Sequence, residues 1–272
     1  MSKAILLNTG WTFTKEGHDE PVTLPHTWNA VDGQDGGNDY WRGCCTYCTR
    51  FAAPVYDPAQ QQVWLQFEGI NASAAVLLNG QQLCTHDGGY STFRAEVTEL
   101  LQAENQLTVR VDNSVNDRVY PQKADFTFYG GIYRDVSLLV VNKNHIALGH
   151  FGDTGVKITP ALQENSADIR VETLVEGSGT VTVELLDAEG RTVAKGEGEN
   201  ASLHLDAPHL WNGVKDPYLY TCVVRLLQDG QPVDEVTTRV GLRSFSVDAM
   251  CAACPSSCSP SAPVRRKARR PA

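Results

Sequence analysis

The chain has 272 residues, of which 42% are hydrophobic and 20% charged, and a formal net charge of −9 at pH 7. This composition is typical of a globular chain with a buried core and excludes a disordered one, and no apolar run approaches the roughly 18 residues of a transmembrane helix. The excess of acidic residues argues against nucleic acid as a partner, because nucleic-acid binding depends on cationic side chains that neutralise phosphates.

From its first residues onward, the sequence predicts β-structure almost throughout. The first apolar run, Ala4 to Leu7, is too short for the core of a signal peptide, so we expect a soluble, cytoplasmic protein with free thiols. Further along, apolar residues alternate with polar ones at the period of two that places every other side chain on a buried sheet face. The clearest runs are 63–67, 107–111, 169–175, 181–185 and 218–226, with hairpin turns expected at Asn79-Gly80 and Asp229-Gly230.

Many short strands separated by turns predict an all-β protein built from sandwiches. The polar stretch at 142–144 separates a larger first unit, residues 1–142, from a second unit, residues 147–248, whose size is near the ~100 residues of an immunoglobulin-like sandwich. Residues 249–272 lack a strand pattern and carry three cysteines, four prolines and five basic residues. We expect this tail to be disordered and, because Ala, Pro, Arg, Ser and Cys enrichment is what an out-of-frame reading of GC-rich DNA gives, to be a frameshift product.

Two groups of cysteines have spacings known from metal or redox sites, but neither predicts such a site. Cys45 and Cys48 fall in a strand-like run, where positions three apart point to opposite faces, so they cannot meet each other or one metal ion. The cysteines of the tail lack the fourth ligand that a structural zinc site needs. No nucleotide-binding, zinc-protease or serine-hydrolase motif is present in the sequence. We therefore expect no metal site in this chain.

Two segments, 24–43 and 125–136, combine aromatic with polar side chains. Aromatic rings stack on the C–H faces of sugars, while Asp, Asn and Arg side chains can hydrogen-bond to sugar hydroxyls. Concave sites of this mixed kind bind small polar ligands. The alternative is structural: the same residues could close the edge of a sandwich, with glycines permitting the turns.

These segments resemble the N-terminal part of glycoside hydrolase family 2, which contains β-galactosidases, β-glucuronidases and β-mannosidases, and most closely its β-galactosidase-like members. The resemblance covers about residues 5–248 and rests on motifs at 24–29, 86–93, 125–136, 208–221 and 241–245. It implies a jelly-roll, galactose-binding-like domain at 1–142, followed by the immunoglobulin-like sandwich at 147–248. In the family a (β/α)8 barrel comes next, and two glutamates of that barrel perform retaining hydrolysis.

The resemblance also implies what this chain lacks. The family's acid/base glutamate follows an asparagine, and the sequence contains no Asn-Glu dipeptide; only residues 249–272 follow the second unit, whereas a barrel needs roughly 250. We expect the non-catalytic N-terminal portion of a β-galactosidase-type enzyme, truncated before the barrel, inactive alone and without a catalytic residue. The alternatives are a stand-alone carbohydrate-binding module and a structural partner of a separately encoded barrel.

The resemblance further implies residues that bind substrate. The jelly-roll aspartate that opens the family signature reaches the barrel's active site and contacts a substrate hydroxyl, and that position is Asp125 here. A neighbouring loop with Asn38, Asp39 and Tyr40 contributes more weakly, and the structural alternative for Asp125 is that it anchors its own loop. Sodium or magnesium is implied only for the full-length enzyme, so we expect no cofactor. Expected partners are a β-galactoside-type glycan and the missing barrel or a second copy of this chain, because uncovered apolar surface favours association.

Overall fold

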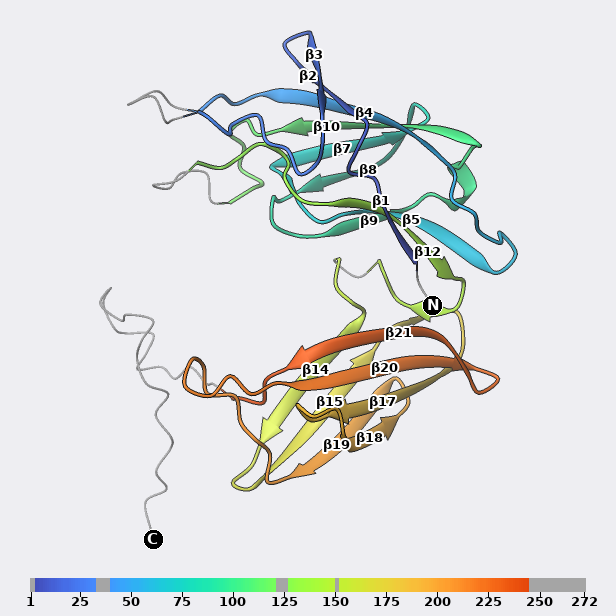
Figure 1. Ribbon diagram of the computed structural model, residues 1–272, viewed down its shortest axis with the longest axis vertical. Helices are drawn as coiled ribbons and strands as arrows, with labels where there is room; N and C mark the ends of the chain where they lie inside the picture. The colour runs from blue at the N-terminus through green and yellow to red at the C-terminus, as the bar shows by residue number, and fades with distance from the viewer. Residues whose placement is uncertain (1–2, 33–39, 121–126, 150–151, 245–272) are drawn as a thin grey trace.

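The computed structural model describes residues 3–32, 40–120, 127–149 and 152–244. These residues form two β-sandwiches, one above the other in Figure 1, and the only helical turn among them is the short 3-10 turn η1 (Thr98–Leu100). The predicted all-β class, a jelly roll followed by an immunoglobulin-like sandwich, is confirmed. Within the described ranges, no helix has the length and apolar character needed to cross a bilayer. The predicted tail, 249–272, lies outside the described residues.

The first sandwich consists of two antiparallel sheets. The four-stranded sheet has the order β1-β12-β5-β9, with β1 (Lys3–Leu6), β12 (Val136–Asn142), β5 (Gln61–Phe67) and β9 (Phe93–Glu96). The six-stranded sheet has the order β3-β2-β4-β10-β7-β8, with β3 (His18–Val22), β2 (Trp11–Lys15), β4 (Cys44–Ala52), β10 (Glu104–Asp112), β7 (Ser73–Leu78) and β8 (Gln81–Asp87). A short pair, β6 (Ile70–Asn71) with β11 (Gly131–Ile132), completes the sandwich.

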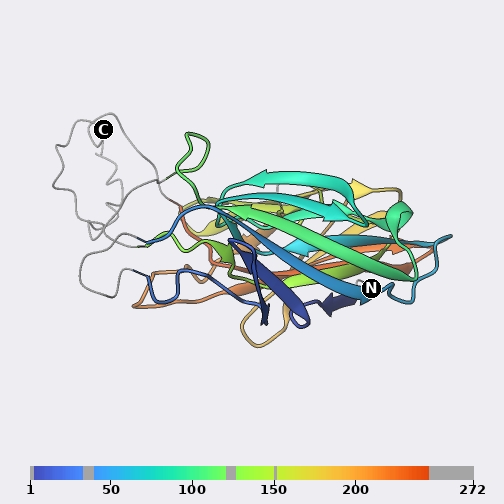
Figure 2. The same cartoon turned by 90° about the horizontal axis from the view of Figure 1, so that it is seen from above.

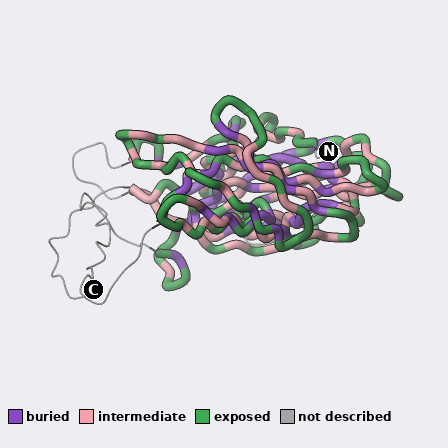
Figure 3. Tube along the Cα trace, turned by 90° about the horizontal axis from the view of Figure 1, so that it is seen from below, coloured by how far each residue is buried: buried purple, intermediate pink, exposed green. Residues whose placement is uncertain are grey.

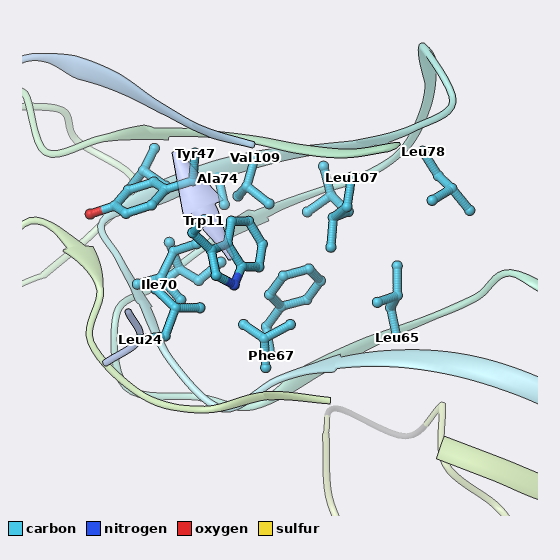
Figure 4. Packing of buried hydrophobic residues seen from close by; sticks show 14 of the residues in the cluster. Trp11, Leu24, Tyr47, Leu65, Phe67, Ile70, Ala74, Leu78, Leu107 and Val109 are labelled. Atoms are coloured by element: carbon cyan, nitrogen blue, oxygen red, sulfur yellow. The ribbon is translucent and has the colours of Figure 1, made fainter. Parts of the chain in front are cut away.

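The core of the first sandwich follows from the period-two alternation. Leu65 and Phe67 of β5 are fully buried and point toward Leu107 and Val109 of β10 in the opposite sheet (Figure 4). Buried positions recur along the strands between exposed ones, as the tube in Figure 3 shows. Each such side chain contributes about 1.5–3 kcal/mol relative to an exposed one. Burial of one face of each sheet therefore holds the two layers together.

The second sandwich has a three-stranded and a four-stranded sheet. The former has the order β14-β15-β19, with β14 (Val156–Leu162), β15 (Ser166–Thr173) and β19 (Asn200–Asp206). The latter has the order β18-β17-β20-β21, with β18 (Thr192–Glu197), β17 (Thr180–Leu186), β20 (Tyr220–Gln228) and β21 (Gln231–Val240). A short pair, β13 (His145–Ile146) with β16 (Val175–Glu176), follows the link to the first sandwich.

The two predicted hairpin turns are present. Asn79 and Gly80 have φ of 52° and 83° between β7 and β8, and Asp229 and Gly230 have φ of 49° and 75° between β20 and β21. Positive φ at both central residues gives the twist that a two-residue hairpin needs, and Asn, Asp and Gly tolerate it best. Local turn chemistry therefore sets the register of both hairpins.

Hydrogen bonds tie the two sandwiches together. Arg94 of β9 donates from Nη1 to the carbonyl oxygens of Leu148 and Asp153, at 2.9 and 2.8 Å, beyond the end of the first sandwich. The Asn142 side chain at the end of β12 donates to the carbonyl oxygen of Val233 in β21 at 2.8 Å. These bonds place the second sandwich against the four-stranded sheet of the first.

Candidate functional site

Loops that are distant in sequence gather at one end of the first sandwich. Residues 24–32 follow β3, 40–43 precede β4, 113–120 follow β10, and 127–130 precede β11. Both views place these loops at the same end, on the left in Figure 1 and Figure 2. We call this region the loop end. It contains the described parts of both aromatic and polar segments noted in the sequence.

One buried amide joins four of these segments. The Asn29 side chain is 0% exposed and donates from Nδ2 to Asp32 Oδ2 at 2.7 Å and to the Trp41 carbonyl oxygen at 2.9 Å. Its Oδ1 accepts from the Gly130 N–H at 2.7 Å and from Asn113 Nδ2 at 3.2 Å. The amide thus uses both its donors and both its acceptor sites within the protein, as a buried amide must. Asn29 therefore organises the loop end and is not available to a ligand.

The paired glycines of the 125–136 segment allow the backbone to approach closely. Thr27 Oγ1 donates to the Gly130 carbonyl oxygen at 2.8 Å. Gly131 has a φ of +131°, and a Cβ there would lie 2.6 Å from the His26 carbonyl oxygen and 2.8 Å from Tyr47 Oη. Such contacts are too short for any side chain, so this position requires glycine. The glycines bring the 127–133 segment against the 26–28 loop.

Two charged side chains, Asp32 and Arg42, hold residues 40–43 in place through hydrogen bonds and a ring contact. Asp32 accepts the hydrogen bond from Asn29 and a second one from the Trp41 N–H at 2.9 Å, and the bond from Asn29 is the main cause that lowers the pKa of Asp32. The Arg42 guanidinium lies 4.4 Å from the ring centroid of Tyr40 and donates to the Tyr40 hydroxyl. A cation over an aromatic face is an attractive arrangement that holds both side chains in place.

A pocket of about 350 Å³ opens at the loop end. Tyr90 and Tyr129 are 57% and 46% exposed, and the ring of Tyr133 meets that of Tyr90 edge to face at 6.4 Å. Burial raises the pKa of Tyr133. The residues that line the pocket are Thr27, Asn71, Tyr90, Thr127, Tyr129 and Tyr133.

The walls of the pocket are fixed by hydrogen bonds to the backbone. Asn71 Nδ2 donates to the Tyr129 carbonyl oxygen at 2.9 Å, and the Tyr133 hydroxyl donates to the Gly89 carbonyl oxygen. Gly89 also packs so tightly on Asn71 that a Cβ at Gly89 would lie 2.5 Å from Asn71 Oδ1. The pocket is therefore largely preformed, as small-molecule sites usually are.

Of the predicted substrate-binding residues, Asp125, Asn38 and Asp39 lie outside the described residues. Tyr40 lies at the loop end, half-buried beside Arg42, but it does not line the pocket. The pocket tyrosines were not among the predicted site residues, although Tyr129 and Tyr133 belong to the singled-out 125–136 segment. Among the described residues, no cluster of three or more His, Cys, Asp or Glu could hold a metal ion.

Comparison with known proteins places both sandwiches in one family. Residues 38–161 match the family model described as "Glycosyl hydrolase 2 galactose-binding domain-like", and residues 150–243 match "Glycosyl hydrolases family 2". A beta-glucuronidase of Bacteroides fragilis is 34% identical over 267 residues, which cover 90% of this chain and 38% of that protein. A beta-galactosidase of Bacteroides ovatus is 32% identical over 258 residues, which cover 84% of this chain and 29% of that protein.

Solved structures show the same correspondence. The crystal structure of an FMN-binding beta-glucuronidase from Facaelibacterium prausnitzii L2-6 superposes with a TM-score of 0.84 at 37% identity, over 91% of this chain and 40% of that chain. This chain therefore spans well under half the length of these relatives. It belongs to glycosyl hydrolase family 2 and corresponds to the N-terminal, galactose-binding-like and immunoglobulin-like portion of the family's members.

Proposed function

We propose that this chain forms the non-catalytic, glycoside-binding side of a family 2 β-glycosidase of the β-galactosidase or β-glucuronidase type. The observation that carries the proposal is the preformed tyrosine-lined pocket at the loop end of a chain that belongs to a glycosidase family. In the full enzyme, two glutamates of a barrel about 5 Å apart would perform retaining hydrolysis. The jelly roll would hold the glycoside from the side opposite to those glutamates.

The arrangement of the two sandwiches supports this proposal. β21 ends on the side of the molecule that carries the loop end, on the left in Figure 1. A segment that continues from β21 would therefore start on the same side as the pocket. Exposed apolar side chains also lie in loops on that side: Val31, Val115, Tyr120, Leu210 and Val214.

The contacts to the sugar itself are assigned to Asp125, with contributions from Asn38, Asp39 and Tyr40. Thr127, two residues after Asp125 in the chain, lines the pocket. A carboxylate accepts hydrogen bonds from hydroxyl groups, and such charge-assisted bonds are stronger than neutral ones. Contacts from one side only give weak binding, so we expect a millimolar Kd, about −4 kcal/mol, for a monosaccharide glycoside.

Calorimetric titration of the 272-residue chain with methyl β-D-galactopyranoside and methyl β-D-glucuronide tests the proposal. We expect saturable binding of at least one of the two, weakened at least about fivefold, or about 1 kcal/mol, by Asp125→Asn. The matched control is Asp229→Asn, an exposed position in the turn between β20 and β21, and it should bind like the unmodified chain. Flat titrations with both glycosides would refute the proposal.

A further inference from the structure

The pocket at the loop end offers a ligand mainly the aromatic rings of Tyr90, Tyr129 and Tyr133 and few hydrogen-bonding groups. None of its six lining residues carries a charge, and three of them are tyrosines. Tyr90 and Tyr129 leave about half of their surface exposed. Aromatic rings of this kind stack face to edge or offset on another aromatic group and gain about 0.5–1.5 kcal/mol beyond the area that is buried.

Several polar groups of the lining are already engaged within the protein. Thr27 Oγ1 donates to the Gly130 carbonyl oxygen at 2.8 Å, Asn71 Nδ2 donates to the Tyr129 carbonyl oxygen at 2.9 Å, and the Tyr133 hydroxyl donates to the Gly89 carbonyl oxygen. A sugar ring needs a partner for each hydroxyl that loses water on binding, because an unpaired buried polar group costs about 1–3 kcal/mol. A pocket whose donors are used to fix its own walls is therefore poorly suited to a sugar.

The volume of about 350 Å³ lies in the range of pockets that enclose small organic molecules. We propose that this pocket binds the uncharged aromatic aglycone of a glycoside, while the sugar lies outside it. This inference rests on the proposed function, since it assigns one half of the same ligand. It makes the jelly roll a determinant of which aglycones are accepted, through the rings of Tyr90 and Tyr129.

Calorimetric titration of the 272-residue chain with a matched pair, methyl and 2-naphthyl β-D-galactopyranoside, tests this inference. The two ligands share the sugar and differ only in the aglycone. We expect the naphthyl glycoside to bind at least about tenfold more tightly, which corresponds to about 1.4 kcal/mol. Tyr90→Ala and Tyr129→Ala should remove most of this difference in affinity between the two glycosides, because the rings contact the aglycone.

Two sets of variants separate loss of the pocket from loss of folding. Tyr90→Phe and Tyr129→Phe keep the rings, so these variants should still bind the naphthyl glycoside more tightly than the methyl glycoside. Tyr120→Ala removes a tyrosine that is 78% exposed but does not line the pocket, and it should also keep the gain. Equal affinity for the two glycosides, or a gain that survives in Tyr90→Ala and Tyr129→Ala, would overturn this inference and leave the proposed function standing. Failure of both galactosides to bind would overturn this inference, and a flat titration with methyl β-D-glucuronide as well would refute the proposed function too.

Discussion

Hydrogen bonds to the carboxylate of Asp32, at the loop end, make the stability of the fold depend on pH. Its carboxylate accepts bonds from Asn29 Nδ2 at 2.7 Å and from the Trp41 N–H at 2.9 Å. The bond from Asn29 is the main cause that holds the pKa of Asp32 below its usual value of 3.8. Because the folded-state pKa is lower than the unfolded one, Asp32 stabilises the fold above about pH 4, and this contribution is lost as the pH falls through the folded-state pKa.

We therefore predict that Asp32→Asn weakens the acid dependence of stability. The free energy of unfolding, measured by urea denaturation from about pH 7 to about pH 3, should fall less steeply below about pH 4 in the variant than in the unmodified chain. Asp229→Asn, in the exposed turn at the other end of the molecule, serves as the control and should follow the unmodified chain. Parallel curves for Asp32→Asn and the unmodified chain would show that the carboxylate is not coupled to folding.

The sequence predicted the region of the site better than the role of each residue in it. The sequence singled out the 24–43 and 125–136 segments, and hydrogen bonds join their described parts at the loop end. For Asn29 and Gly131, however, the structural interpretation holds. The Asn29 amide is fully used within the protein, and a Cβ at Gly131 would lie only 2.6 Å from the His26 carbonyl oxygen. A sequence pattern gives the residue type, but not which hydrogen-bonding atoms remain unpaired after folding.

At the scale of one element, β4 shows that a two-residue period determines which thiols are accessible. Cys45 faces the core and is buried, Cys48 lies on the opposite face beside Thr108, and Cys44 at the start of the strand is exposed. Burial raises the pKa of Cys45 to about 12. The expectation that Cys45 and Cys48 point to opposite faces is confirmed.

Alkylation of the native chain should follow this pattern. With iodoacetamide at about pH 8.5, we expect Cys44 to react at least about tenfold faster than Cys45, because the thiolate is the reactive species and Cys45 is both buried and protonated. Cys222, buried in the second sandwich, should be protected like Cys45. Peptide mapping by mass spectrometry measures each site, and the same reaction in urea shows that every cysteine can be labelled. Similar native rates for Cys44 and Cys45 would contradict the strand assignment.

Strands and hairpins were predictable because their signals are local, whereas the pocket depends on pairings between distant segments. The pair β1 and β12 joins residues more than a hundred positions apart, and no local pattern specifies it. The pocket likewise depends on Tyr133 donating to Gly89 and on Arg134 donating to the Tyr90 carbonyl oxygen at 3.2 Å. The motifs containing these tyrosines were visible in the sequence, but their convergence required the fold.

For the molecule as a whole, Arg94 is a polar link between the first sandwich and the segment that leads to the second. Its guanidinium donates to Gln66 Oε1 within the first sandwich at 2.7 Å and to the carbonyl oxygens of Leu148 and Asp153, at 2.9 and 2.8 Å, in the segment that leads to the second. Three hydrogen bonds from one charged group fix the geometry of this segment. A charged hydrogen bond contributes about 1.5–3 kcal/mol.

Arg94→Met keeps most of the side-chain volume and removes all three bonds. We predict a loss of about 2–4 kcal/mol of stability and a broadening of the calorimetric transition toward separate unfolding of the two sandwiches. Arg110→Met, at an exposed position of β10, is the matched control and should unfold like the unmodified chain. If the two variants gave the same transition, the sandwiches would be held together by other contacts.

Glycoside binding without hydrolysis is the central property that we propose for this chain. An NMR titration with p-nitrophenyl β-D-galactopyranoside and p-nitrophenyl β-D-glucuronide, with each sample kept for a day and then measured again, tests binding and hydrolysis together. We predict saturable shifts that include the ring signals of Tyr90 and Tyr129 with at least one of the two, and ligands that remain intact because the sequence contains no Asn-Glu acid/base motif. Shifts that do not saturate with either glycoside, or p-nitrophenol that accumulates with the pure chain, would contradict the account.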